Sequence, residues 1–526
     1  MITIQSVRVT PVAAPPTGFG GDARNISQGG PTYANVYLQI ATNDSRLSGS
    51  SIIFTNGYGL KEMCQLTEQF ATRFLLASDS PIRVDTLHEG TNFGRLCQRM
   101  LQDSDYCWLG AVGMSRMAIG AIINGLWDLL AKHQQKPAWH VLAQMQPEQL
   151  IACVDFEHIS DALTPADALA LLQNAQRGLA QRIARVYQRG LLAYNTAGWS
   201  GISIEQLQAQ TRVMIDRRWP QIKIKVGASF AQRRLQLTEQ DQTPNRSQLD
   251  QLAKEAADDD VVRLRAVFET IGHYDRRHQP LQIAVDSNQV FDVRSAVVFI
   301  GHLGKELYRL NPDYKIVWFE EPTTPHSAMA HLAIQHSLQL AFTDYEPPLE
   351  VPLSTGEQGA SPVVFKDLLF ANLGRFEHEL TCSIEVIQMD YSRVAGIADN
   401  LAILLLAQHA RQQGRDVRIC PHTGGIGLCE GMRNVQALQH ALFGHTNIKG
   451  TPDILEFVEE PERSVHEGVF SNPAIVVDGH YQMGSTPGVG VDYSDAGLAR
   501  YRLPDGSAWT ENDKFHALAK RFMGEH

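Results

Sequence analysis

The sequence predicts an α/β protein built on a (β/α)8-type barrel. Two observations carry this prediction. From about residue 185 onward, short apolar runs alternate with helical segments, which is typical of βαβ units and a parallel sheet. In addition, one ionisable residue follows each of several consecutive apolar runs, at an interval close to the length of one strand-and-helix unit.

The intervals between these ionisable residues are regular. Subtracting positions gives 34 residues from Asp286 to Glu320, then 37 to Glu357, 33 to Asp390 and 32 to His422. One barrel unit takes roughly 30 residues, because eight units fill about 250. A single Asp, Glu or His after a strand is usually a cap or a loop charge. A register shared by consecutive units indicates instead an active site at the carboxyl ends of the strands.

Two lysines precede this series. In the run Gln221-Ile-Lys-Ile-Lys-Val226, Lys223 and Lys225 are two residues apart, so on a strand they share a face. Such a pair is ordinarily an edge or surface feature. Here it precedes Asp286 by one strand-and-helix unit, which a polar stretch lengthens. We expect each lysine to lower the pKa of the other, with partial desolvation adding to the effect.

The first 150 residues or so predict α+β structure. Residues 2–9 and 34–40 alternate as strands do, and residues 118–132 carry apolar side chains at helical spacing. Glycines in 18–21 and 29–31 indicate a loop between the two strands. Later, 229–262 and 341–353 interrupt the barrel rhythm. We expect both to be surface insertions, with Asp258-Asp259-Asp260 as a solvated acidic patch.

The composition excludes several classes of protein. With 526 residues, 44% hydrophobic and 20% charged, the chain can form a large core. The net charge of -11 disfavours nonspecific binding to nucleic acid or anionic membranes. The seven cysteines form no C-x-x-C pair, the first residues lack a signal-peptide pattern, and no uncharged apolar run is long enough to span a membrane. We therefore expect a cytoplasmic protein with no nucleic-acid or membrane partner.

The ionisable series suits a definite chemistry. Three carboxylates from adjacent strands offer hard oxygen ligands, which favour Mg²⁺. A metal ion there could bind a substrate carboxylate and stabilise the charge that develops when the α-proton leaves. The lysines on one side and the histidine on the other would flank the substrate, and an Asp on the preceding strand could orient the histidine.

The order of the motifs resembles the mandelate-racemase-like subgroup of the enolase superfamily, and within it L-fuconate dehydratase and related acid-sugar dehydratases. The matching motifs are Lys-x-Lys, a strand-end Asp, Glu320-Glu-Pro, Thr355-Gly-Glu, a second strand-end Asp and Pro421-His-x-Gly-Gly. Stretches at 155–165, 196–199 and 478–488 are similar to that family too, so the resemblance covers nearly the whole chain.

The resemblance implies a domain plan and an activity. Residues 1–150 and 451–526 would form an α+β capping domain over the mouth of a barrel at 151–450. The activity would be Mg²⁺-dependent dehydration of a small acid sugar, with its loss of water giving a 2-keto-3-deoxy acid. We also expect a homo-oligomer.

The resemblance also assigns roles to individual residues. The metal ligands would be Asp286, Glu320 and Glu357. Because Glu320 and Glu321 are adjacent, they face opposite sides of a strand, and Glu320 aligns with the ligand position. Lys225 would take the C2 proton with Lys223 beside it, and His422, paired with Asp390, would act as the acid at the C3 hydroxyl. Glu430 would lie near the substrate carboxylate, and the substrate-binding residues would be Asp22, Trp108 and Asn288.

The pocket lining departs from the family pattern, and alternatives remain open. Ser361-Pro362 stands where close relatives carry Asn-Arg, and Ala111 and Gly113 stand where they carry Pro and Lys. A racemase or epimerase would use the same lysines and histidine. A non-catalytic sugar-acid or metal-binding barrel is a second alternative. A phosphate cradle at 424–427 is a third, although no G-x-G-x-x-G or Walker pattern is present.

Overall fold

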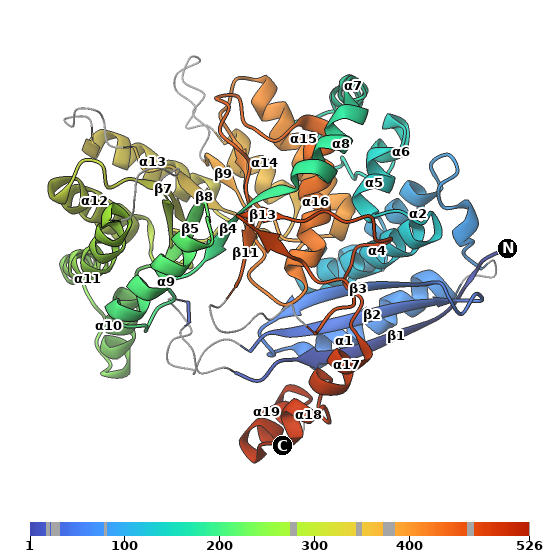
Figure 1. Cartoon of the computed structure of the whole chain (residues 1–526), viewed down its shortest axis with the longest axis horizontal. Coiled ribbons are helices and arrows are strands. Elements are labelled where there is room, and N and C mark those ends of the chain that lie inside the picture. Colours follow the sequence, from blue (N-terminus) through green and yellow to red (C-terminus); the bar gives the residue numbers. More distant parts are fainter. Residues whose placement is uncertain are drawn as a thin grey trace.

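The computed structural model describes residues 1–16, 21–22, 32–77, 81–273, 281–342, 350–371, 384–459 and 468–524. Its elements fall into two groups (Figure 1). One is a three-stranded antiparallel sheet with its helices, and the other is a larger, mostly parallel sheet that curls among its own helices. The mixed α/β class is therefore confirmed.

The first group is built from the N-terminal region. Its sheet has the order β1-β2-β3, with every neighbouring pair antiparallel. The strands are β1 (Ile4–Ala13), β2 (Ala34–Thr42) and β3 (Ser48–Thr55). The helical segments are α1 (Leu60–Ala71), η2 (Thr72–Leu76), η3 (Val84–Thr86), α2 (Asn92–Leu101), α3 (Ser104–Trp108), α4 (Met114–His133), α5 (Ala138–Ala143) and α6 (Pro147–Ile151). The predicted strands and the predicted helix at 118–132 are confirmed, whereas most of the glycine-rich loop lies outside the described residues.

The second sheet has the order β10-β9-β8-β7-β6-β5-β4-β13-β12, and β11 pairs with β4. The pairings from β4 to β10 and between β11 and β4 are parallel, while β13 and β12 run antiparallel. The strands are β4 (Leu191–Thr196), β5 (Gln221–Lys225), β6 (Gln282–Asp286), β7 (Ile316–Glu320), β8 (Leu353–Thr355), β9 (Val386–Ile387), β10 (Arg418–Ile419), β11 (Leu455–Phe457), β12 (Val476–Val477) and β13 (His480–Tyr481).

Helices alternate with these parallel strands, as the sequence rhythm predicts. They are α7 (Pro165–Ala175), α8 (Leu179–Arg189), α9 (Ile204–Asp216), α10 (Ala228–Glu239), α11 (Arg246–His273), α12 (Val293–Leu310), α13 (Ala328–Phe342), α14 (Pro362–Phe370), α15 (Gly396–Gln412) and α16 (Leu428–Phe443). Among the helices within the described residues, none combines the length and the apolar character needed to cross a membrane.

Strand β5 shows how the sequence sets the two faces of the larger sheet. All five of its residues are buried. Side chains alternate along a strand, so Ile222 and Ile224 share one face with the apolar core while Lys223 and Lys225 share the other. A buried lysine needs carboxylate partners, and the neighbouring strands supply them, as described below.

Helix α4 joins the two groups. It is buried on nearly all sides and packs between β3 and α15. Glycine lets the backbones approach: a Cβ at Gly120 would lie 2.3 Å from the carbonyl oxygen of Val394. Asn124 Oδ1 accepts a hydrogen bond from the Ile397 N–H at 2.9 Å, and Arg116 forms a 2.6 Å ion pair with Asp399. The segment after β9 is therefore held in place by the N-terminal group.

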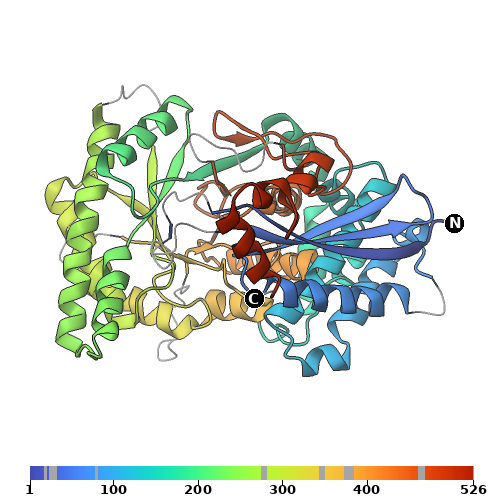
Figure 2. The ribbon, with the colours of Figure 1, turned by 90° about the horizontal axis from the view of Figure 1, so that it is seen from below.

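The C-terminal segment returns to the first sheet. Helices α17 (Asp495–Tyr501), α18 (Ser507–Thr510) and α19 (Asp513–Phe522) lie beside it in both views (Figures 1 and 2). The Leu503 N–H donates to Pro11 O at 2.9 Å, and Trp509 Nε1 donates to Ala13 O at 2.7 Å. Residues near the two ends of the chain thus stabilise the same part of the molecule.

The polar stretch at 229–262 differs from a simple surface insertion. It folds into α10 and most of α11, which pack against each other and against α9 and α12. The expectation that Asp258-Asp259-Asp260 is wholly solvated is wrong for Asp260, which is buried. Its carboxylate accepts the Gly227 N–H at 2.7 Å and pairs with Arg263 at 2.9 Å, and these partners offset the cost of burial. Of the other predicted insertion, 343–349 lie outside the described residues.

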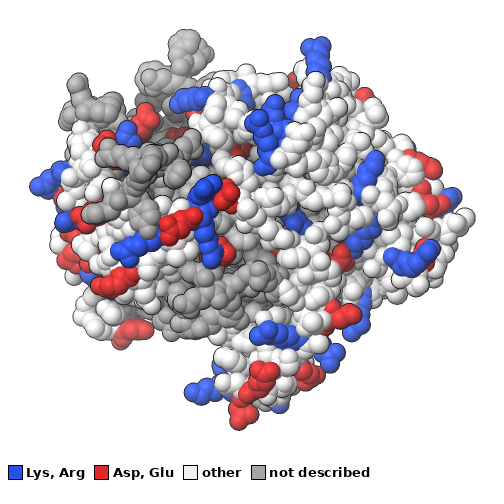
Figure 3. All heavy atoms as spheres, viewed as in Figure 1, with Lys and Arg blue, Asp and Glu red and all other residues white. Residues whose placement is uncertain are grey.

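Charged side chains of both signs are scattered over the face of the molecule in Figure 3. Uncharged surface separates most of them, and the C-terminal helices carry acidic and basic side chains together.

Candidate active site

Three carboxylates meet at the carboxyl ends of neighbouring strands. Asp286 ends β6, Glu320 ends β7 and Glu357 follows β8 by two residues. One oxygen from each lies within 4.8 Å of the others. Their donor atoms are all carboxylate oxygens, which fits a hard divalent cation and not a soft thiolate-binding metal. The group could hold such an ion, and metal binding itself stays a prediction.

Glu320 lies at the centre of a buried network. Its Oε1 accepts from Lys223 Nζ at 2.6 Å, and its Oε2 accepts from Gln388 Nε2 at 2.7 Å and Trp318 Nε1 at 3.1 Å. Burial raises the pKa of Glu320 to about 8, although Lys223 opposes this change. The neighbouring Glu321 turns elsewhere: its φ is 48°, and its carboxylate accepts from Gln289 Nε2 at 2.7 Å.

Both lysines of β5 contact these carboxylates. Lys225 Nζ lies 2.5 Å from Asp286 Oδ2, and Lys223 Nζ lies 3.6 Å from the same atom. Burial favours neutral amines, yet the carboxylates hold the pKa of both lysines above the ordinary value, with Glu320 acting most on Lys223 and Asp286 most on Lys225. The expected lowering of the lysine pKa is therefore wrong for this arrangement, because attraction to the carboxylates exceeds the repulsion between the amines.

His422 and Asp390 form a pair on the far side of the carboxylates. Asp390 Oδ2 lies 2.8 Å from His422 Nδ1, while Asp390 Oδ1 accepts the Ser392 N–H at 2.6 Å. His422 Nε2 lies 3.4 Å from Glu357 Oε2. Burial alone would lower the pKa of His422, but Glu357, Asp390 and Glu456 together raise it to about 9. These carboxylates thus favour the charged form of the imidazole.

The glycines after His422 allow close packing of the loop. A Cβ at Gly424 would lie 2.5 Å from His422 Nε2, and a Cβ at Gly425 would lie 2.5 Å from the ring of Phe54. Gly427 has a φ of 83° and precedes the first residue of α16. These close approaches explain why glycine occupies the positions.

Glu456 on β11 belongs to the site and is absent from the sequence prediction. Its Oε1 lies 2.9 Å from Lys223 Nζ and accepts a hydrogen bond from the Thr196 hydroxyl. Its Oε2 accepts the Thr423 N–H at 2.7 Å. The signal was present: 456 − 422 is 34, the same interval as in the predicted series. Glu456 therefore links the lysine side of the site to the histidine side.

Glu430, expected near the substrate carboxylate, is buried on α16. Its Oε1 accepts the Ala474 N–H at 2.8 Å, and its charge acts on the nearby Arg433. These contacts place it against the C-terminal segment, and its catalytic role stays a prediction.

The three expected substrate-binding residues have different surroundings. Asp22 is close enough to Lys225 for its charge to raise the pKa of that amine. Asn288, with a φ of 47°, donates its N–H to Asp286 Oδ1 at 2.9 Å, so it orients a candidate ligand. Trp108 ends α3 and is 91% exposed. Pro362, in the pair that departs from the expected Asn-Arg, begins α14, and Ser361 directly precedes it. Substrate contacts by any of these residues stay predictions.

Comparison with known proteins identifies the family. The family described as Enolase C-terminal domain-like matches residues 206–497, more than half of the chain. Mitochondrial enolase superfamily member 1 from Xenopus laevis is 29% identical over 97% of this chain and 98% of its own length. L-galactonate dehydratase from Hypocrea jecorina is 29% identical over 94% and 93%, respectively.

Solved structures agree with this match. The human Mitochondrial enolase superfamily member 1 has a TM-score of 0.77 at 27% identity, covering 97% of this chain and 98% of its own. L-talarate/galactarate dehydratase from Salmonella typhimurium LT2, in a structure liganded with Mg and L-lyxarohydroxamate, has a TM-score of 0.61 at 18% identity, covering 95% and 93%. The second likeness shows a shared fold. With the family match spanning the strands that carry the clustered carboxylates, lysines and histidine, this chain belongs to the enolase superfamily.

Proposed function

We propose that this protein is a Mg²⁺-dependent hydro-lyase that dehydrates a sugar acid, an aldonate such as L-fuconate or a related acid sugar, to a 2-keto-3-deoxy acid. The observation that carries the proposal is the arrangement around the carboxylate group, with the Lys223–Lys225 pair on one side and the His422–Asp390 pair on the other. The names of two relatives, L-galactonate dehydratase and L-talarate/galactarate dehydratase, support the same reaction class.

The proposal includes a closed (β/α)8 barrel formed by β4 to β11, capped by residues 1–150 and 451–526. Closure is supported by the parallel pairing of β11 with β4 and by the Glu456 N–H, which donates to Pro421 O after β10 at 3.3 Å. The cap is supported by contacts near the strand ends: Asn35 Nδ2 donates to Ile426 O at 2.9 Å.

Asp286, Glu320 and Glu357 would hold the metal ion. When bound, the ion supplies positive charge that stabilises the negative charge developing on the substrate carboxylate as the C2 proton leaves. The oxygen-only donor set supports Mg²⁺, and so does the Mg named in the Salmonella structure.

The side chains divide the proton transfers between them. Lys225 would take the C2 proton on Nζ in its neutral form, with Lys223 beside it. That form requires a cation on Asp286 to offset the attraction that raises the pKa of the amine. The electron pair left at C2 forms the C2–C3 double bond as the C3–O bond breaks. His422 Nε2 gives its proton to the departing hydroxyl, which leaves as water, because Nδ1 is held by Asp390. The resulting enol becomes the 2-keto-3-deoxy acid by moving its hydroxyl proton to C3.

A panel of aldonic and aldaric acids tests this proposal. The full-length protein with Mg²⁺ is incubated with each acid, and 2-keto-3-deoxy product is measured. We expect product from at least one acid, and none with Lys225→Ala. Inversion at C2 without keto product would establish the racemase or epimerase instead. Binding of an acid with neither product nor C2 exchange would favour a non-catalytic barrel.

We further propose a cytoplasmic homo-oligomer, following the sequence expectation. Sedimentation of the purified protein across a concentration series tests the assembly, and a species at monomer mass throughout would contradict it.

A further inference from the structure

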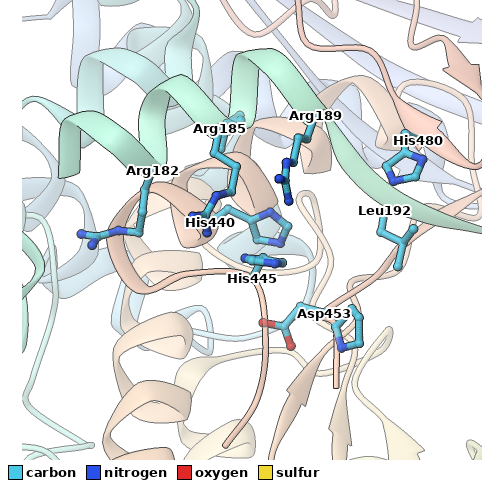
Figure 4. Close-up of a pocket in the computed structure, with 11 residues that line it drawn as sticks. Arg182, Arg185, Arg189, Leu192, His440, His445, Asp453 and His480 are labelled. Atoms are coloured by element: carbon cyan, nitrogen blue, oxygen red, sulfur yellow. The ribbon is translucent and has the colours of Figure 1, made fainter. Parts of the chain in front are cut away.

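A small cavity lies at the opposite end of the larger sheet from the candidate active site. Figure 4 shows the residues that line this cavity. Its volume is about 170 Å³, and it lies among α8, the start of β4, the end of α16 and the segment before β11. Leu192 lies near the start of β4 and Asp453 precedes β11, whereas the carboxylate cluster lies at the strands' carboxyl ends. A ligand here would be separate from the site described above.

Basic side chains dominate the lining of this pocket. Three arginines lie at positions 182, 185 and 189 of α8, a spacing that places them on one face of the helix. Three histidines come from the other walls. In Figure 4 the side chains of Arg185, His440 and His445 lie close together, whereas the guanidinium of Arg182 points away from them. The lining basic residues are Arg182, Arg185, Arg189, His440, His445 and His480.

The one acidic residue of the lining, Asp453, is already engaged inside the protein. Its Oδ1 accepts from Arg411 Nη2 at 2.6 Å and from the Ile419 N–H at 2.8 Å. Its Oδ2 accepts from Gln439 Nε2 at 2.9 Å. Because Arg411 balances its charge, Asp453 does not neutralise the arginines of α8.

The arginines retain their charge. Arg182 donates to the carbonyl oxygens of Ala441 and Arg177, each at 2.7 Å, which fixes its guanidinium without neutralising it. Within the part of the chain that the structure describes, neither Arg185 nor Arg189 has an ion-pair partner. Two guanidinium groups are therefore available at the opening of the pocket.

The histidines add hydrogen-bond donors. His440 is only 7% exposed, and its Nε2 lies 3.1 Å from Gln436 Nε2. A neutral imidazole carries one N–H donor, whichever of its two nitrogens holds the proton. Burial lowers the pKa of His445, and the charges of Arg185 and Arg189 lower it further. The pocket thus combines fixed positive charge with neutral N–H donors.

We propose that this pocket binds a phosphate group, either as inorganic phosphate or as the monophosphate of a small metabolite. Near neutral pH a phosphate carries close to two negative charges and several acceptor oxygens, which match guanidinium and imidazole donors. A carboxylate has one charge and two oxygens, so it would leave most of these donors unused. The volume suits a phosphate group, and Arg185 and Arg189 are both exposed, so a ligand can reach them from solvent.

Calorimetric titration of the full-length protein with inorganic phosphate tests the proposal. Ionic strength is held constant with chloride. The pocket variant is Arg185→Gln/Arg189→Gln. The matched control is Arg8→Gln/Arg212→Gln, which removes the same charge from exposed positions outside the pocket. We expect one saturable site in the wild type, unchanged in the control and at least ten-fold weaker in the pocket variant.

Further measurements distinguish this pocket from other places where phosphate could bind. Asp286→Asn removes a candidate metal ligand, so binding that persists in this variant supports the pocket. Binding lost in Asp286→Asn but kept in the pocket variant would overturn the proposal. Glycerol phosphate, compared with inorganic phosphate, distinguishes an ester from the free anion. No saturable binding of either, together with altered sedimentation of the pocket variant, would overturn it in favour of a contact between copies of the chain.

Discussion

Lys223 Nζ lies 2.9 Å from Glu456 Oε1, an ion pair that joins β5 to β11, two strands that are far apart in the sequence. Glu456 also receives the Thr423 N–H, next to His422. One buried carboxylate therefore sets the position of a lysine on one side of the site and of the loop that carries the histidine on the other.

Replacing Glu456 by glutamine should reduce kcat by about 100-fold, the order of loss that follows misplacement of reacting groups. KM and the melting temperature should change far less, because the amide has the same shape. Steady-state kinetics and thermal unfolding measure both. Glu385→Gln is the control: Glu385 is a half-buried carboxylate at the amino end of β9, where it contacts Gln335. Wild-type kcat in Glu456→Gln would contradict the positioning role.

Lys225→Ala and His422→Asn should separate the two proton transfers. With substrate in D₂O, Lys225→Ala should abolish both dehydration and exchange of the C2 hydrogen, because no base remains. His422→Asn should abolish dehydration and leave exchange at C2. NMR of the substrate measures both processes, with the exposed Lys449→Ala as control. Exchange retained in Lys225→Ala and lost in His422→Asn would reverse the roles.

Mg²⁺ binding should depend on Glu320 and not on Glu321. Glu320→Gln should weaken Mg²⁺ binding by more than the roughly 10- to 100-fold typical of lost outer partners. Glu321→Gln makes the same substitution in a side chain that faces Gln289, so this variant should bind Mg²⁺ nearly as the wild type does. Calorimetric titration of each variant tests this. Full turnover after exhaustive chelation would refute metal dependence altogether.

Stability should depend on the contact between α4 and the segment before α15. Gly120→Ala would place a Cβ against the backbone at Val394, so we expect a loss of about 1–3 kcal/mol in unfolding free energy. Gly301 on α12 has open space around its missing side chain, and Gly301→Ala should gain roughly 0.5–1 kcal/mol. Urea denaturation of both variants gives the comparison. Equal effects of the two substitutions would show that the close approach is unimportant.

A buried histidine should make the fold sensitive to acid. Burial lowers the pKa of His331 to about 4, against an ordinary value of 6.5. Between these values the unfolded chain binds the extra proton, so the contribution of His331 is complete above pH 6.5 and declines as the pH falls toward 4. The slope is at most about 1.4 kcal/mol per pH unit. The urea concentration at the midpoint of unfolding, measured at pH 7.5, 6 and 5, should therefore fall less steeply with decreasing pH for His331→Gln than for the wild type. Parallel curves for the two proteins would contradict this.

The strand-end residues were predictable because alternating strands and helices repeat at nearly constant intervals, and the parallel sheet brings the carboxyl ends of its strands together. Glu456 follows the same interval, but β11 is only three residues long. Glu456 stands between its two apolar residues instead of following an apolar run, as the predicted residues do. Glu430 was placed by the family resemblance alone, and its contact with the Ala474 N–H depends on the C-terminal segment, which no local pattern around residue 430 indicates.

Burial within polar stretches was not predictable either. Asp260 is enclosed because Arg263 and the Gly227 N–H provide its partners, and that environment exists only once α11 packs against the rest of the molecule. The prediction of a lowered lysine pKa was wrong for a related reason. The carboxylates that act on the lysines of β5 lie 61 residues or more further along the chain.

Arg263 on α11 donates from Nη1 to the carbonyl oxygen of Lys225 at 2.7 Å and from Nη2 to those of Gly198 and Trp199, each at 3.2 Å. The polar stretch between β5 and β6 thus braces the backbone of the residue proposed as the base. Any chimera that trims this stretch to the length of a compact barrel unit removes that brace, so a graft of the active-site strands into another scaffold must carry α11 with them.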